Sequence, residues 1–171
     1  ETALAYRPDL VIWPEAATPR AVLWDRDTLD AVLEVLSLQD FALLFGTLDF
    51  EPAPDSEWGL TFNAAVLFQD RDATPQVYRK VRLVPFGEFV PFRRSFPLFA
   101  AVVGDQVPSD FDAGTERTIF RLEDPAVTIA PLICFEDTLG DHVRRFVGGG
   151  ADLLANMTND VWFGRSSGSR Q

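Results

Sequence analysis

The chain has 171 residues, of which 47% are hydrophobic, and this length and composition suit about one globular domain with a buried core. It carries 26 acidic and 15 basic residues and a formal net charge of -11, without a Lys/Arg-rich cluster, which argues against binding to a nucleic-acid backbone. The single Cys134 excludes an internal disulfide, and because His142 is the only histidine we expect no metal site.

The first part of the chain predicts a strand and then a helix. Residues 9–14, DLVIWP, form a short apolar run closed by proline, which is typical of a buried strand. Within residues 25–39, apolar side chains recur at i, i+3, i+4 and i+7, at Leu29, Val32, Leu33 and Leu36. Acidic residues lie near the start of this segment, where the helix dipole favours them, so it is predicted to be helical.

The next predicted elements are strands. Three strand-like runs lie at residues 41–50, 62–69 and 75–81, with a Pro/Asp/Ser-rich stretch between the first two. We expect two or three of these runs to pair with one another.

Beyond a Pro- and Phe-rich segment at residues 84–104, which has no clear period, the strand pattern returns. Strands are predicted at residues 117–123 and 127–135, a short helix at 137–147 and a strand at 151–158. Strands mixed with amphipathic helices indicate the α/β class, with interior strands covered by other layers.

Cys134 lies at the C-terminal end of the predicted buried strand that contains the sequence PLICFED, just before a turn into a helix. Ligands gather beyond the carboxyl ends of strands in α/β sheets, and a nearby helix N-terminus lowers the pKa of a thiol. The position suits a nucleophile. A lone cysteine on an apolar strand is also often an inert small hydrophobic residue, and both interpretations remain open at this point.

Two other predicted strand ends carry residues that would activate a thiol. Glu15 follows the strand at residues 9–14, where a carboxylate can accept the thiol proton. Lys80 ends another predicted strand, where an ammonium can stabilise a thiolate and an oxyanion. Alternatively, Glu15 caps a turn and Lys80 is a surface cation. No sequence rule by itself brings the three residues together.

Four motifs in one order are familiar: VIWPEAATP, YRKVRLVPFGEFVPF, ICFED and NMTNDVWFG. Together they closely resemble the nitrilase-like, or carbon-nitrogen hydrolase, domain of the apolipoprotein N-acyltransferases. The resemblance runs from about Pro8 to Gly164. It implies a nitrilase-like αββα sandwich with a Glu-Lys-Cys catalytic triad.

By this resemblance, the catalytic residues are Glu15 as general base, Lys80 as the cation that stabilises the oxyanion, and Cys134 as nucleophile. The backbone N–H of Phe135 would complete the oxyanion hole; many family members have tyrosine at this position. Glu88 and Glu136 match two further acidic positions of the family and are expected to support the site.

The implied reaction has two halves and needs no diffusible cofactor. Cys134 takes an acyl chain from a glycerophospholipid as a thioester, and the α-amino group of a diacylglyceryl-cysteine lipoprotein then receives it. The expected partners are therefore a phospholipid acyl donor, a diacylated lipoprotein acceptor and a membrane reached through the parent protein, without nucleic acid.

Two aromatic groups are candidates for lipid contact. Trp162 and Phe163 are expected to wall the acyl pocket, although such a pair is also ordinary core material. In the Phe-rich segment at residues 89–104, aromatic side chains surround Arg93 and Arg94, a combination that suits a membrane surface. Its phenylalanines, Phe89, Phe92, Phe96 and Phe99, would equally suit this domain's own core.

We expect residues 1–171 to form a single, truncated catalytic domain. The resemblance implies that first elements, C-terminal elements and the membrane-spanning part belong to a longer parent. The sequence of residues 1–171 contains no run of roughly 18 apolar residues, the length needed to span a bilayer. The implied location is the bacterial cytoplasmic membrane, with this domain on the periplasmic or outer side, and the isolated fragment is expected to be prone to inactivity.

Two alternatives to the acyltransferase function remain. One is a nitrilase-type amidohydrolase acting on a small amide, and the other is a noncatalytic scaffold, which an ordinary, high thiol pKa at Cys134 would favour.

Overall fold

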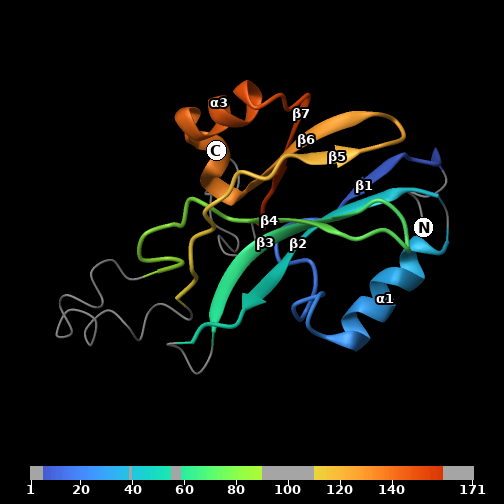
Figure 1. Cartoon of the computed structure of the whole chain (residues 1–171), viewed down its shortest axis with the longest axis horizontal. Helices are drawn as coiled ribbons and strands as arrows, with labels where there is room; N and C mark the ends of the chain where they lie inside the picture. Colours follow the sequence, from blue (N-terminus) through green and yellow to red (C-terminus); the bar gives the residue numbers. More distant parts are fainter. Residues whose placement is uncertain (1–5, 39, 55–58, 90–109, 160–171) are drawn as a thin grey trace, which may run out of the picture.

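The computed structural model describes residues 6–38, 40–54, 59–89 and 110–159. In these ranges two β-sheets face each other, with helix α1 (Arg26–Leu36) outside one sheet and helix α3 (Gly140–Gly148) outside the other (Figure 1). This α–β–β–α arrangement confirms the expected α/β sandwich.

The first sheet contains the strands predicted in the first half of the chain. Its order is β1-β2-β3-β4, with β1 parallel to β2 and the other neighbours antiparallel. The strands are β1 (Leu10–Ile12), β2 (Ala42–Glu51), β3 (Leu60–Phe68) and β4 (Gln76–Arg79). The expected pairing of the three central runs is confirmed, and it places the ends of β1 and β4 on either side of β2 and β3.

The second sheet has the order β5-β6-β7, formed by β5 (Phe120–Leu122), β6 (Val127–Ile133) and β7 (Leu153–Met157). A 3-10 helix, η3 (Cys134–Thr138), and α3 connect the parallel strands β6 and β7. The prediction that β6 reaches residue 135 was wrong by two residues, because Cys134 has φ 55°, a left-handed conformation that cannot continue a strand. The helix also begins later than predicted, at Gly140.

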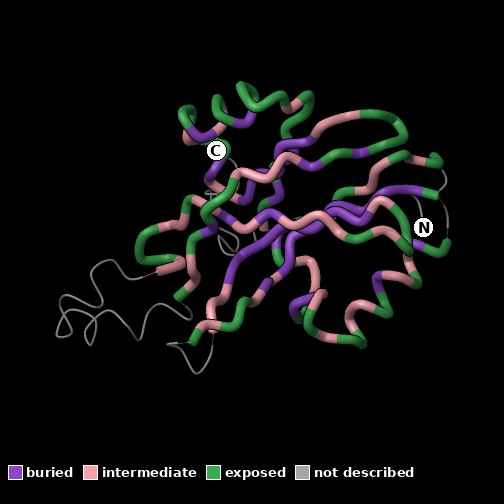
Figure 2. Tube along the Cα trace, viewed as in Figure 1, coloured by how far each residue is buried: buried purple, intermediate pink, exposed green. Residues whose placement is uncertain are grey.

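Two apolar clusters explain why β2 and β3 read as nearly continuous hydrophobic runs. The larger cluster fills the space between the sheets, where Leu44 and Leu67 meet Ile129 and Leu132. The second lies between α1 and the outer face of the first sheet, in a group that contains Val32, Leu36, Leu43, Phe45 and Val66. Neighbours in a strand point to opposite faces, so both faces of β2 are covered (Figure 2).

A glycine in β2 lets the loop after β1 lie directly on the sheet. Gly46 donates its N–H to the carbonyl of Pro14 at 3.1 Å, and its carbonyl accepts from the N–H of Ala17 at 2.8 Å. A Cβ atom added at Gly46 would lie only 2.6 Å from the Cα of Glu15. The lack of a side chain at Gly46 therefore fixes how closely the loop with Glu15 approaches the sheet.

Gly46→Ala should lower the free energy of unfolding by about 1–3 kcal/mol, because the new methyl group overlaps the backbone at Glu15. Gly148→Ala is the matched control, since its Cβ would have no atom within 4 Å and it lies in α3. Urea unfolding of the two variants and the wild type measures the difference. Equal unfolding midpoints for Gly46→Ala and the wild type would contradict this close approach.

Candidate active site

Three strand ends from the two sheets bring together the residues that the sequence singled out. Glu15 lies in the loop after β1, Lys80 directly follows β4, and Cys134 directly follows β6. Lys80 is 1% exposed and its ammonium lies 5.5 Å from the centre of the Phe135 ring, next to Cys134. The charges of Glu15 and Lys80 both influence the pKa of the Cys134 thiol, so the three groups share one electrostatic environment.

A chain of hydrogen bonds connects the lysine to the first carboxylate. Lys80 Nζ donates to Glu88 Oε1 at 2.8 Å, and Asn63 Nδ2 donates to the same oxygen at 3.0 Å. The same Asn63 nitrogen also donates to Glu15 Oε1 at 2.8 Å. Glu88 Oε2 accepts from the N–H of Val84 at 2.9 Å, which fixes the turn that carries Glu88. Glu88 therefore contacts the lysine, whereas sequence reasoning missed Asn63.

The Cys134 thiol is half-buried, and its pKa is raised above its ordinary value. Burial is the largest cause, followed by the negative charge of Glu15. Lys80, the backbone N–H of Phe135 and the side chain of Thr158 oppose the increase in this pKa. The resting residue is therefore a neutral thiol beside a carboxylate, with donors already placed around the sulfur to stabilise a thiolate.

The Glu136 carboxylate is fully buried and accepts hydrogen bonds from backbone on both sheets. Its Oε1 accepts from the N–H groups of Val81 and Arg82 at 3.1 and 2.9 Å, directly after β4 and Lys80. Its Oε2 accepts from the N–H of Ile133 at 3.0 Å, at the end of β6. Burial raises the pKa of Glu136, and these backbone donors limit the increase. Glu136 thus connects the backbone at Lys80 to the backbone at Cys134.

Tyr78 and His142 complete this buried cluster. The Tyr78 hydroxyl donates to the Glu136 carboxylate, at 2.9 and 3.0 Å from its two oxygens, and burial raises the pKa of Tyr78. His142 Nε2 lies 3.3 Å from that hydroxyl and 3.4 Å from Glu136 Oε1. Burial lowers the pKa of His142 to about 4, helped by the positive charges of Arg117, Arg82 and Arg145. The histidine is therefore neutral at neutral pH.

The remaining predicted residues are located only in part. Phe135 places its backbone N–H at the Cys134 sulfur. Trp162 and Phe163, and the Phe-rich segment beyond Phe89, lie outside the described residues. Among the residues that the structure describes, no group of three or more His, Cys, Asp or Glu side chains is arranged to hold a metal ion.

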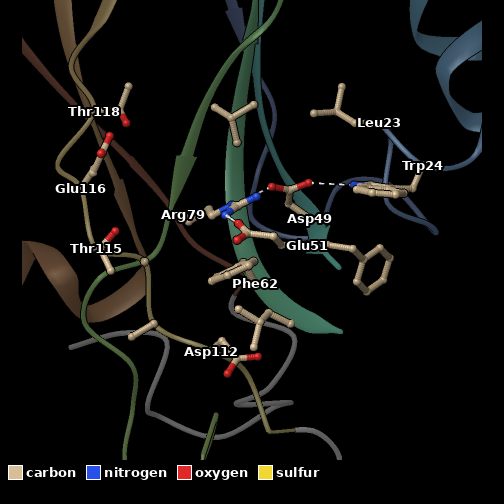
Figure 3. Close-up of a pocket in the computed structure, with 15 residues that line it drawn as sticks. Leu23, Trp24, Asp49, Glu51, Phe62, Arg79, Asp112, Thr115, Glu116 and Thr118 are labelled. Carbon is tan, nitrogen blue, oxygen red and sulfur yellow. Dashed lines mark hydrogen bonds and ion pairs between the residues drawn. The ribbon is translucent and has the colours of Figure 1, made fainter. Parts of the chain in front are cut away.

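A hollow of about 820 Å³ lies away from this cluster, on the outer face of the first sheet (Figure 3). Arg79 lies in it, paired with Asp49 and Glu51 and stacked over Phe62, with Trp24 donating to Asp49. Lys80, the next residue, is buried beside Glu88. Because successive strand residues face opposite sides, this hollow belongs to the other face of β4 and not to the cluster around Cys134.

The carbon-nitrogen hydrolase family profile matches residues 1–171. The chain belongs to this family. Curated relatives include the apolipoprotein N-acyltransferases of Brucella suis, at 32% identity over 96% of this chain, and Rhizobium meliloti, at 34% identity over 98%. The chain spans only 30–31% of the length of these two relatives. These matches confirm the resemblance to the apolipoprotein N-acyltransferases.

Similar solved structures confirm the fold of this chain. A glutamine-dependent NAD+ synthetase from Acinetobacter baumannii has a TM-score of 0.60 at 19% identity, over 92% of this chain and 27% of its own. An amidase from Nesterenkonia sp. has a TM-score of 0.59 at 17% identity, over 92% and 54% of the two chains. In the described ranges, no helix is both long and apolar enough to cross a bilayer.

His142 should make the protein sensitive to mild acid. The unfolded chain takes up a proton near the ordinary histidine pKa of about 6.5, whereas the folded chain does so near a pKa of about 4. Stability is therefore lost as the pH falls through this window, by up to about 3 kcal/mol.

His142→Gln should remove this loss, so that the variant and the wild type differ in how the free energy of unfolding changes between pH 7 and pH 4. Glu136, whose pKa is raised, is present in both proteins, so acid titration of this group is part of both curves. Urea unfolding at a series of pH values measures the effect. Parallel curves for the two proteins would show that His142 does not cause the acid sensitivity.

Proposed function

We propose that this chain is the catalytic domain of an N-acyltransferase that moves an acyl chain from a glycerophospholipid to the N-terminal amine of a diacylated lipoprotein. The observation that carries the proposal is the half-buried Cys134 thiol, whose pKa is shifted by the charges of one carboxylate, Glu15, and one buried ammonium, Lys80. The names of the relatives, at 32–34% identity, support the acyl-transfer branch of the family.

In the first half-reaction, Cys134 Sγ attacks the carbonyl carbon of an acyl ester while Glu15 accepts the thiol proton. The ester C–O bond breaks, and the proton moves from Glu15 to the departing alcohol, which leaves as a lysophospholipid. In the second, the lipoprotein amine attacks the thioester and gives its proton to Glu15. The C–S bond breaks, an amide is formed, and the thiolate recovers the proton.

The raised pKa of the resting thiol is compatible with this role. A scaffold with an inert cysteine would also have a high thiol pKa, but part of the increase here comes from the charge of Glu15, the group proposed as base. A nucleophile with an adjacent general base loses its proton during the attack and needs no free thiolate beforehand. Lys80 and the N–H of Phe135 would then stabilise the negative charge on sulfur and on the carbonyl oxygen.

The buried cation is neutralised before any substrate arrives, which suits a lipid ester that carries no charge at its reacting carbon. Lys80 Nζ donates to Glu88 Oε1 at 2.8 Å, so the buried ammonium is paired with a carboxylate, while its charge still opposes the effect of Glu15 on the thiol pKa. In this proposal the parent protein lies in the bacterial cytoplasmic membrane with this domain on the periplasmic or outer side.

The full-length parent, in detergent with a glycerophospholipid, should gain the mass of one acyl chain, and hydroxylamine should remove it. Cys134→Ser should lack this hydroxylamine-labile adduct. Lys80→Met, which keeps the chain length but not the charge, should form the adduct at least about 100-fold more slowly, as expected when one oxyanion donor is lost. Intact-protein mass spectrometry measures all three.

A folded wild-type protein that never forms the adduct would refute the acyltransferase proposal. If the same protein hydrolysed short amides without phospholipid, the activity would be that of a nitrilase-type amidohydrolase. If neither reaction occurred, the noncatalytic scaffold would remain.

A further inference from the structure

We propose that Asn63 is a positioning residue for the base: its amide nitrogen holds Glu15 toward the thiol and separates Glu15 from Glu88. This inference rests on the proposed function, in which Glu15 is the base. Asn63 lies on β3, is 7% exposed, and donates from one nitrogen to both carboxylates, at 2.8 and 3.0 Å.

The chemistry of the two neighbours determines which way the amide points. A side-chain amide has two N–H donors on nitrogen and only acceptor capacity on oxygen. Carboxylates are acceptors, so the amide oxygen would be repelled where the nitrogen lies. Both donors of Asn63 are used, one for Glu15 and one for Glu88. No other single neutral side chain of this size supplies two donors from one atom.

These two bonds address a problem of like charge. Glu15 and Glu88 both contact one nitrogen, so their carboxylates lie within a few ångströms of each other. Two carboxylates at such a separation normally raise the pKa of one of them until it holds a proton. A protonated Glu15 could not act as a base. Asn63 places one N–H donor against each carboxylate, which offsets part of the repulsion between them.

The amide also keeps the ammonium away from the base. Lys80 binds Glu88 at 2.8 Å, whereas Glu15 Oε1 is bound by the neutral Asn63. An ammonium bound directly to Glu15 would form an ion pair with the carboxylate and compete with the thiol proton for its oxygens. In the described part of the chain, Glu15 Oε2 has no hydrogen-bond donor. In this proposal that oxygen accepts the proton of Cys134, the thiol whose pKa the charge of Glu15 raises.

The backbone of Asn63 fixes this arrangement from the other side. The carbonyl of Asn63 accepts from the backbone N–H of Lys80 at 2.8 Å. Asn63 therefore also fixes the position of the Lys80 backbone, from which the ammonium side chain extends. Asn63 pairs with Leu48 of β2 in the centre of the sheet, which leaves its backbone little freedom.

The test compares Asn63→Asp and Asn63→Leu in the full-length parent, with Gln69→Glu as the matched control. Aspartate has the same shape but donates only when protonated, and leucine cannot donate at any pH. Gln69→Glu makes the same amide-to-acid change directly after the other end of β3, and it keeps a side-chain oxygen to accept from the backbone N–H of Glu123, which Gln69 Oε1 does at 3.0 Å. The measurement is the rate of Cys134 alkylation by iodoacetamide from pH 5 to pH 9, expressed as the ratio to the wild type.

For Asn63→Asp the ratio should fall to about 0.1 at neutral and higher pH, a change equal to one pKa unit of the thiol, and rise toward 1 as the pH falls and the introduced carboxylate gains a proton. For Asn63→Leu the ratio should differ from 1 at every pH and show no recovery at low pH, because no donor remains to hold Glu15 in place. Gln69→Glu should follow the wild type throughout. Recovery of Asn63→Asp at low pH would itself show that this variant is folded.

A wild-type rate and profile in Asn63→Leu would overturn the proposal, and so would an equal, pH-independent loss in both Asn63 variants. Because alkylation needs no phospholipid, these outcomes are separate from failure of the acyl-transfer reaction. A wild-type protein without an acyl adduct but with the expected alkylation profiles would leave the role of Asn63 intact and change only the substrate.

Discussion

The site depends on one buried carboxylate that belongs to neither sheet. Glu136 lies in the 3-10 helix between β6 and α3, and it accepts backbone N–H groups from the end of β4 and from the end of β6. Removing a carboxylate from water is expensive, and such a group is stable only when its oxygens are fully hydrogen-bonded. Because these bonds begin one residue from Lys80 and one from Cys134, the separation of the two is set by backbone geometry and not by flexible side chains.

Charge is distributed around the thiol in an order that follows from this geometry. Lys80 is neutralised by Glu88, Glu88 and Glu15 are separated by the neutral amide of Asn63, and Glu15 retains an oxygen for the thiol. The charges of Glu15 and Lys80 both act on the pKa of the Cys134 thiol: Glu15 raises it and Lys80 lowers it. Lys80 is thus paired with a carboxylate, whereas Glu15 is bound by a neutral amide.

Much of this architecture is predictable from hydrophobic patterns, and the exceptions have physical causes. The apolar run at residues 41–50 indicates a strand covered on both faces, and β2 is one. Each of Glu15, Lys80 and Cys134 could be assigned to a strand end. That the three ends meet could not be derived from periodicity, since it depends on pairing between distant strands and on packing between sheets.

Asn63 and the left-handed backbone at Cys134 were missed for different reasons. Asn63 lies within LTFNAAVLF, an apolar run in which one buried polar residue was itself the available signal, because buried amides need partners. The φ of 55° at Cys134 has no signal in the sequence, because cysteine has no preference for that conformation. It results from the turn that brings Glu136 back to the end of β6.

That backbone conformation bears on how such a site changes during evolution. A residue with a Cβ atom in the left-handed region costs about 1–2 kcal/mol that a glycine would not. A lineage that had lost the need for a nucleophile would relieve this strain by exchanging Cys134 for glycine, at the cost of only the few packing contacts that a small, half-buried side chain makes at the edge of the core. A cysteine retained at such a position is opposed by folding energetics, and continued selection for the thiol is the simplest force that would keep it there.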